Sequence, residues 1–92
     1  MEDRRIPVEE FIDFPTRFSF KAIGHHTREF APAAFRVVRE ILGDDRGVEL
    51  RTRLSRQAAY ISATVTARVD SAEELRTVYA ALWKLEGVIT VL

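Results

Sequence analysis

Apolar and polar side chains alternate along three stretches of the chain, and this period of two predicts β-strands. The stretches are residues 17–23, 48–54 and 61–69. We expect the first strand to end at Gly24, because glycine often bounds a strand. Only a turn near residues 55–58 separates the second stretch from the third, so these two are predicted to form a β-hairpin.

Between residues 28 and 42 the apolar side chains instead recur every three or four positions, which predicts an amphipathic helix. Thr27 precedes this stretch as the expected N-cap, and Gly43 follows it as the expected stop. A proline deep inside a helix costs about 3 kcal/mol. The regular helix is therefore expected to begin near Pro32, after a looser first turn.

A second helix is predicted after Asp70 or Ser71, either of which can cap it, with acidic side chains in its first turn. We expect Gly87 to end this helix, and residues 88–92 to form a final short strand. The apolar stripe of the helix consists of Leu75, Val78, Tyr79, Leu82 and Leu85.

The predicted order of elements, βαββαβ, is that of a ferredoxin-like α+β sandwich. Right-handed crossovers place both helices on one face of a four-stranded antiparallel sheet. The strand order is then fourth, first, third, second, which makes the fourth and second strands the edges. Residues 14–92 form this single domain, and residues 1–13 are an acidic lead-in with a short helical turn over residues 7–12.

The composition fits one small globular domain, with 92 residues of which 47% are hydrophobic and 30% charged. The absence of cysteine excludes a disulfide scaffold, a thiolate metal site and a cysteine nucleophile. No apolar stretch has the length of a membrane span or the form of a signal peptide, so we expect a cytoplasmic protein with no membrane partner. Lys and Arg total 14 and so do Asp and Glu, and this balance disfavours a nucleic-acid partner.

Enzyme chemistry finds little support among the residues present. An acylphosphatase-like enzyme needs an arginine cradle, which Arg28 could supply, and also an asparagine that positions the attacking water. The chain contains no asparagine. Since it also contains no recognisable nucleophile–base set or metal-ligand spacing, we predict a protein that is not an enzyme and uses no cofactor or metal.

The loop between the first strand and the first helix holds the candidate ligand-binding residues, Gly24, His25, His26 and Thr27. Adjacent histidines rarely chelate one ion well, so a metal is not expected here. The loop does meet a helix N-terminus, where backbone N–H groups can contact a small ligand. The alternative is a solvated connecting loop that binds nothing.

The candidate interaction surface consists of Arg51, Arg53, Arg56, Arg68 and Trp83. The arginines form a basic strip along the second strand and the hairpin, which suits an anion or an acidic partner. The alternative is that they only discourage association at a sheet edge. Trp83 lies on the shoulder of the second helix's apolar stripe, where it either joins the core or faces a partner.

The face of the sheet away from the helices bears on nucleic-acid binding. An RNA-recognition sheet needs aromatic side chains on its two central strands, on which bases stack. The outward residues of those strands are Ser19, Lys21, Tyr60, Ser62, Thr64 and Thr66. One tyrosine is not a stacking platform, so nucleic-acid binding is only the alternative function.

The last predicted strand, residues 88–92, is apolar on both faces and forms an edge of the sheet. Such an edge favours strand-to-strand association, in a homodimer or with a partner. The alternative is that the segment around Phe11, Ile12 and Phe14 folds over it.

Three stretches of the sequence together resemble the YbeD-like family of small bacterial proteins of unknown function. They are FPTRFSFKAIG at residues 14–24, YISATVTARV at 60–69 and ELRTVYAALWKLEGVITVL at 74–92. The resemblance implies a ferredoxin-like fold likened to ACT regulatory domains and, from the family's frequent naming, a regulatory role connected with lipoate. It implies no catalytic residues. Arg56, Gln57 and Ala58 stand where a glycine-bearing hairpin turn is expected.

The sequence therefore predicts a small non-enzymatic regulatory or protein-interaction module. Its partner is expected to be a protein or a small metabolite, with lipoate suggested by the family resemblance alone. A nucleic-acid-binding module that uses the open sheet face is the alternative.

Overall fold

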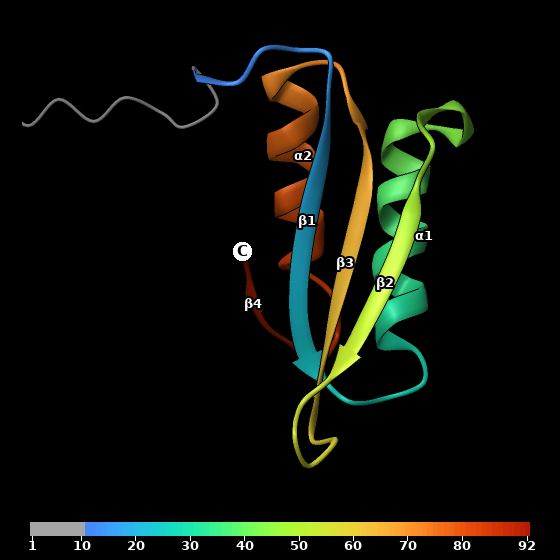
Figure 1. The fold of residues 1–92 in the computed structure, drawn as a ribbon, viewed down its shortest axis with the longest axis vertical. Coiled ribbons are helices and arrows are strands. Elements are labelled where there is room, and N and C mark those ends of the chain that lie inside the picture. The colour runs from blue at the N-terminus through green and yellow to red at the C-terminus, as the bar shows by residue number, and fades with distance from the viewer. Residues whose placement is uncertain (1–10) are drawn as a thin grey trace, which may run out of the picture.

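The computed structural model describes residues 11–92, which form a two-layer sandwich in the order βαββαβ (Figure 1). A short 3₁₀ turn, η2 (Asp44–Arg46), lies between the first helix and the second strand. Most of the helical turn expected over residues 7–12, and most of the lead-in over residues 1–13, lie outside the described residues. The strands are β1 (Thr16–His25), β2 (Glu49–Leu54), β3 (Tyr60–Val69) and β4 (Val88–Val91), and the helices are α1 (Phe30–Leu42) and α2 (Ala72–Leu82).

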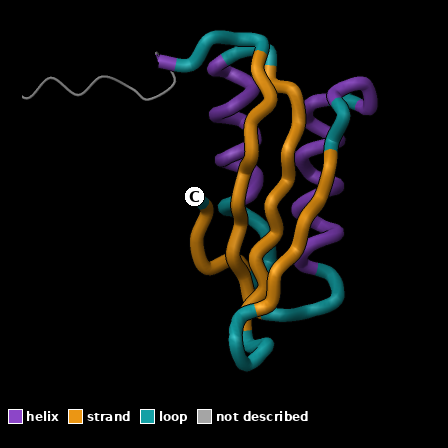
Figure 2. The backbone as a smooth tube through the Cα atoms, in the orientation of Figure 1, coloured by secondary structure: helices purple, strands orange, loops and turns teal. Residues whose placement is uncertain are grey.

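The four strands formed by residues 11–92 lie in the order β2-β3-β1-β4, and every pairing is antiparallel. β1 and β3 pair along their whole length, from Thr16 opposite Val69 to His25 opposite Tyr60. Both helices cover the same face of the sheet and leave the other open (Figure 2). The predicted ferredoxin-like sandwich and its strand order are confirmed.

The core lies between the sheet and the helices, and it is built from the apolar half of each alternation. On β3 every second residue from Ile61 to Val69 is buried, and on β1 Phe20 lies opposite Val65. Fully burying one large apolar side chain contributes roughly 1.5–3 kcal/mol, so these contacts are the main source of stability. The apolar residues within residues 11–92 that have no exposed surface are Phe20, Ala22, Ala34, Val38, Ala63, Val65, Ala67, Val69, Val78 and Leu82.

Gly24 does not end the first strand, as we had expected, because β1 continues to His25. The glycine instead allows the Phe30 ring to pack closely against the backbone of β1. A Cβ atom at this position would lie 2.4 Å from Cε1 of Phe30, the first residue of α1. Glycine therefore lets the start of α1 lie directly against the strand.

The first helix begins at Phe30, and its N-cap is Glu29, whose side chain makes no capping hydrogen bond. The prediction of Thr27 as the cap was wrong, because residues 28 and 29 still belong to the connecting loop and turn. Pro32 lies in the first turn of α1, where the missing N–H has no intrahelical partner to lose. The expected end of the helix at Gly43 is confirmed.

The second helix is capped by Ser71, whose side chain accepts a hydrogen bond from the backbone N–H of Glu74. It ends at Leu82 rather than near Gly87. Leu85 therefore lies in the following turn, although it still packs against the core. Gly87 has a φ of 83° and turns the chain into β4 rather than ending the helix.

The hairpin between β2 and β3 contains an alanine in the conformation that favours glycine. Ala58 has a φ of 55°. Ser55 holds this turn, because its backbone N–H donates to the Tyr60 carbonyl at 2.9 Å and its hydroxyl accepts from the Tyr60 N–H at 3.0 Å. The turn thus forms without the glycine that the resemblance leads one to expect.

β4 pairs only with one end of β1, where Ala22 lies opposite Val91. Ile89 and Leu92 are 43% and 61% exposed at this edge. The segment that begins at Phe11 meets the other end of β1, at Thr16 (Figure 1). Six residues of extended strand separate these ends by about 20 Å, so residues 11–14 do not cover the β4 edge.

Candidate functional site

The four candidate ligand-binding residues after β1 do not gather in one place. Gly24 is buried against Phe30 on the helix side of the sheet. His25 is exposed on the open face, where its ring lies 5.7 Å from the ring of Tyr60. The backbone N–H of His25 donates to the carbonyl of Gly87 at 3.0 Å, which ties β1 to the turn before β4.

His26 binds the β2–β3 hairpin. Its backbone N–H donates to the carbonyl of Ala59 at 3.1 Å, and its ring Nδ1 lies 2.8 Å from the carbonyl oxygen of Ala58. Since a carbonyl can only accept, this contact requires the proton on Nδ1. The imidazole therefore contacts the backbone of a turn. Of the four candidates, Thr27 lines a pocket on the helix side.

The pocket beside Thr27 has a volume of about 360 Å³. It lies where the loop after β1, the first turns of α1 and the turn before β4 come together. Two carboxylate residues are part of its lining, which suits a ligand with a cationic or amino group better than a free carboxylate. The lining residues are Thr27, Glu29, Phe30, Ala33, Glu86 and Gly87.

The candidate interaction surface is only partly a continuous surface. Arg51 and Arg53 lie on the open face of β2, opposite Thr64 and Ser62 of β3. Arg68 also lies on this face, but its Nε donates to Asp70 at 3.0 Å. Arg56 is in the hairpin turn.

Trp83 belongs to a different part of the molecule, at the C-terminal end of α2, where it is 51% exposed. Its helical neighbour Tyr79 is half-buried instead, and its ring packs edge-on against Phe20 with the centroids 5.2 Å apart. Burial raises the pKa of Tyr79. Tyr79 thus joins the core while Trp83 does not.

Two cations outside the candidate interaction surface also lie on the open face, Arg17 and Lys21 of β1. Arg17 is paired, because its Nη2 donates to the Glu49 carboxylate and to the Gly47 carbonyl, each at 3.0 Å. Lys21 lies opposite Thr64, on the other side of β3 from Arg51. The alternation on β1 already placed Lys21 on this face, but only the register between strands shows that it lies in line with Arg51.

The open face is hollowed in two places next to these cations. One hollow, of about 260 Å³, is bordered by Lys21, Arg53 and Tyr60. The other, of about 290 Å³, is bordered by Arg17, Arg51 and the Thr64 side chain between them. Within residues 11–92 the side chains of Lys21, Arg51 and Arg53 make no ion pair or hydrogen bond.

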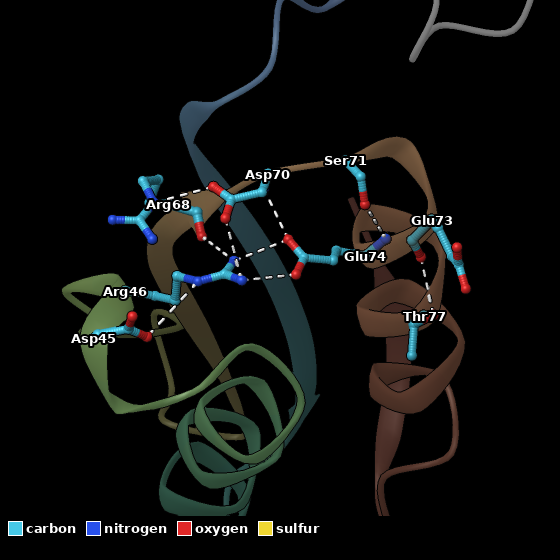
Figure 3. A network of polar contacts seen from close by, with 8 residues as sticks. All are labelled: Asp45, Arg46, Arg68, Asp70, Ser71, Glu73, Glu74 and Thr77. Carbon is cyan, nitrogen blue, oxygen red and sulfur yellow. Dashed lines mark hydrogen bonds and ion pairs between the residues drawn. The ribbon is translucent and has the colours of Figure 1, made fainter.

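A second cluster of charges lies at the end of the sheet nearest Arg17, where it joins η2, the end of β3 and the start of α2 (Figure 3). The Arg46 guanidinium donates two hydrogen bonds of 2.8 Å to the Glu74 carboxylate. It also lies 3.3 Å from Asp70 and donates to the Arg68 carbonyl at 3.2 Å. We call this cluster the Arg46–Glu74 clasp.

The hydrogen bonds from Arg46 lower the pKa of Glu74 from its ordinary value of 4.5 to about 2. The Glu74 carboxylate also accepts the backbone N–H of Asp70 at 2.8 Å, which completes the cap of α2. A shifted carboxyl pKa can mark a catalytic group. Here the group is saturated with partners, so the clasp is structural.

The described residues hold no cluster of histidine, aspartate or glutamate side chains able to bind a metal ion. No helix within residues 11–92 is long and apolar enough to cross a membrane.

Comparison with known proteins connects this architecture to a family. The sequence profile of the family DUF493, described as a protein of unknown function, matches residues 9–92. The chain belongs to this family. A UPF0250 protein from Neisseria gonorrhoeae is 36% identical over 81 residues, which cover 88% of this chain and 89% of the relative. A UPF0250 protein from Shewanella amazonensis is 29% identical over 84 residues, covering 91% and 93%. The resemblance seen in the sequence is thereby confirmed.

Two solved structures share the fold of this DUF493 chain. The solution structure of protein HP0495 from Helicobacter pylori matches with a TM-score of 0.69 and 18% identity, over 98% of each chain. The ACT domain of a GTP pyrophosphokinase from Chlorobium tepidum matches with a TM-score of 0.60 and 16% identity, over 85% of this chain and 96% of that domain. These likenesses establish an ACT-like ferredoxin fold.

Proposed function

We propose that this DUF493 chain is a non-enzymatic regulatory module that binds a small amino-bearing metabolite in the pocket beside Thr27. The observation that carries the proposal is the place of this pocket. It is bordered by two segments that are far apart in sequence, residues 27–33 and residues 86–87. A ligand there would contact both segments, and so could stabilise one arrangement of them over others.

The chemistry of the lining supports a ligand with a positive group. Glu29 and Glu86 are both among the residues that line the pocket. A free carboxylate such as that of lipoate would meet like charge there, whereas an ammonium group would meet opposite charge. The family resemblance suggests a ligand related to lipoate. Lipoamide fits this pocket better than lipoate does, because an uncharged amide replaces the carboxylate.

The polar groups outside the pocket support a role without catalysis. The most strongly shifted carboxyl group, Glu74, is held by Arg46 in the clasp. The ring of His26 contacts the backbone of the hairpin. Both groups therefore have structural partners in place of a substrate.

A thermal-shift screen followed by calorimetry tests the proposal, with amino acids, lipoate, lipoamide and nucleotides as the compounds. A ligand at a hundred times its Kd stabilises a protein by about 2.7 kcal/mol. We expect this stabilisation from an amino-bearing compound and none from free lipoate. Glu86→Gln should weaken the binding, while Glu40→Gln, on the exposed side of α1, should leave it unchanged. A screen without any stabilising compound, or equal loss in both variants, would contradict the proposal.

A further inference from the structure

The open face of the sheet carries an imbalance of charge that the fold does not use. The protein as a whole has a formal net charge of +0. On this face, however, Lys21, Arg51 and Arg53 are exposed and have no partner among residues 11–92. The only acidic residue on the open face of β1, β2 and β3 is Glu49, and it already forms an ion pair with Arg17. Positive charge is therefore left unmatched on one side of the molecule.

Protection of a sheet edge explains only part of this pattern. Charged side chains on an edge strand discourage association between sheets, and β2, which carries Arg51 and Arg53, is an edge. Lys21 lies on β1, which is central and paired on both sides. A cation at the middle of the face gives no protection to an edge, and as an exposed charge it is available for binding.

The spacing of the three cations suits an extended acidic chain. Arg51 and Arg53 lie two residues apart on one strand, about 7 Å. Carboxylates on alternate residues of an extended segment have the same spacing, so two of them can meet the two arginines. Lys21 lies two strands away from Arg51, about 10 Å. One hollow is bordered by Lys21 and Arg53, and the other by Arg51.

The surroundings of the cations favour a protein partner over nucleic acid. Leu54 and Tyr60, which border the hollow beside Arg53, are 47% and 44% exposed. Arginine and tyrosine are enriched at protein interfaces. Tyr60 is the single Phe, Tyr or Trp side chain on the open face of β1 and β3, whereas binding of single-stranded nucleic acid uses several stacked aromatics. The sequence pI of about 6.7 also provides no overall positive field.

We infer that the open face of the sheet docks an extended acidic segment of a partner protein, held by Lys21, Arg51 and Arg53. This surface lies on the side of the sheet away from the helices, so the inference does not depend on the pocket beside Thr27. The module can then engage a partner on one side while a ligand occupies the other.

Fluorescence anisotropy with the purified chain tests the inference. The probe is a labelled peptide of alternating glutamate and serine, with a lysine–serine peptide as its charge-reversed counterpart. We expect the acidic peptide to bind at low salt and to be released as salt rises, and the basic peptide not to bind. The double variant Arg51→Glu/Arg53→Glu should weaken binding by about tenfold or more.

A matched control separates docking on this face from the effect of net charge. Arg36→Glu/Lys84→Glu reverses the same number of charges on exposed residues of α1 and the turn after α2. This variant should bind the acidic peptide within about twofold of the unchanged protein, because its open face is intact. An equal loss in both double variants, or no binding of the acidic peptide at low salt, would overturn the inference.

Two further outcomes would assign the open face to a different binding partner. Tighter binding of single-stranded oligo-dT than of the acidic peptide, lost in Arg51→Glu/Arg53→Glu, would assign the face to nucleic acid. A dimer in sedimentation that this double variant converts to a monomer would show that a second copy of the chain occupies the face. Either result would overturn the assignment to an acidic segment.

Discussion

Arg46 on the helix side of the sheet and three cations on the open side differ in whether carboxylates pair with them. On the helix side the Arg46 side chain is only 12% exposed, and it is surrounded by carboxylates and a backbone carbonyl. On the open side Lys21, Arg51 and Arg53 are exposed and have no ion-pair partner among the described residues. Arg46 is thus matched by carboxylates on the helix side, whereas these three cations of the open side are not matched within residues 11–92.

The difference follows from the cost of removing charge from water. An uncompensated buried charge destabilises a protein by about 3–5 kcal/mol. The partly buried Arg46 avoids much of this cost because Glu74 and Asp70 pair with it. An exposed charge carries almost no such cost, and a surface pair contributes only about 0–1 kcal/mol. Stability therefore does not determine the open-face cations, which leaves them available for binding.

The largest expected change in the free energy of unfolding comes from comparing two adjacent residues of β3. Val65 has no exposed surface, whereas Thr64 lies on the open face between Arg51 and Lys21. Val65→Asp places an unpaired charge in the core and should cost about 4 kcal/mol, a large part of the roughly 5–15 kcal/mol that stabilises a domain. Thr64→Asp should change the free energy of unfolding by at most about 1 kcal/mol.

Urea unfolding followed by circular dichroism measures both variants. Because successive side chains point to opposite faces, similar losses at the two positions would mean that the open face is covered, and the contrast between the two sides would not hold. The double variant Thr64→Asp with Arg51→Ala identifies which cation the new carboxylate contacts.

A smaller change in the free energy of unfolding is expected when one arginine from each side of the sheet is replaced. Arg46→Met removes the charge-assisted hydrogen bonds to Glu74 and should cost about 2 kcal/mol. Arg51→Met removes a cation without a partner and should change stability by less than about 0.5 kcal/mol. The measurement is urea unfolding at neutral pH, and a loss in Arg51→Met as large as in Arg46→Met would contradict the difference between matched and unmatched charge.

The dependence on pH gives the clasp a signature of its own. The pKa of Glu74 is about 2 in the folded chain and about 4.5 when the group is free of its partners. A lowered pKa stabilises the fold above the unfolded value, and this contribution disappears as the pH falls from about 4.5 to 2. Arg46→Met should therefore flatten the loss of stability in this range, while Arg51→Met should leave the profile unchanged.

Local patterns were sufficient to predict most of the fold. The strict alternation from Ile61 to Val69 determined which face of β3 is buried. Asp70 or Ser71, followed by acidic residues, placed the start of α2 to within one residue of its cap, Ser71. Each of these signals lies within a few residues of the feature that it predicts. The predicted end of α2 near Gly87 was wrong, because the apolar period continues through Leu85 although the helix stops at Leu82.

The sites were harder to predict because they depend on contacts between distant residues. Arg46 and Glu74 are separated by 28 positions, and neither residue type alone indicates the pair. Lys21 lies in line with Arg51 only because of the register of β1, β3 and β2. The histidine pair attracted attention as a chemical motif, but the alternation of the strand directs His25 to the open face and leaves His26 at the hairpin.

The smallest expected effect concerns the hairpin turn that links β2, with its two open-face arginines, to β3. Ala58 has a φ of 55°, which costs a non-glycine residue about 1–2 kcal/mol. Ala58→Gly removes this strain but increases the freedom of the unfolded chain, so a net stabilisation of about 0.5 kcal/mol is expected. The matched variant Ala59→Gly, at a neighbour without a positive φ, should instead destabilise by a similar amount. Urea unfolding of both variants provides the test, and stabilisation by Ala59→Gly or a loss in Ala58→Gly would show that the turn is not strained at residue 58. Because neither change alters a charge, both variants should keep the affinity of the open face for the acidic peptide.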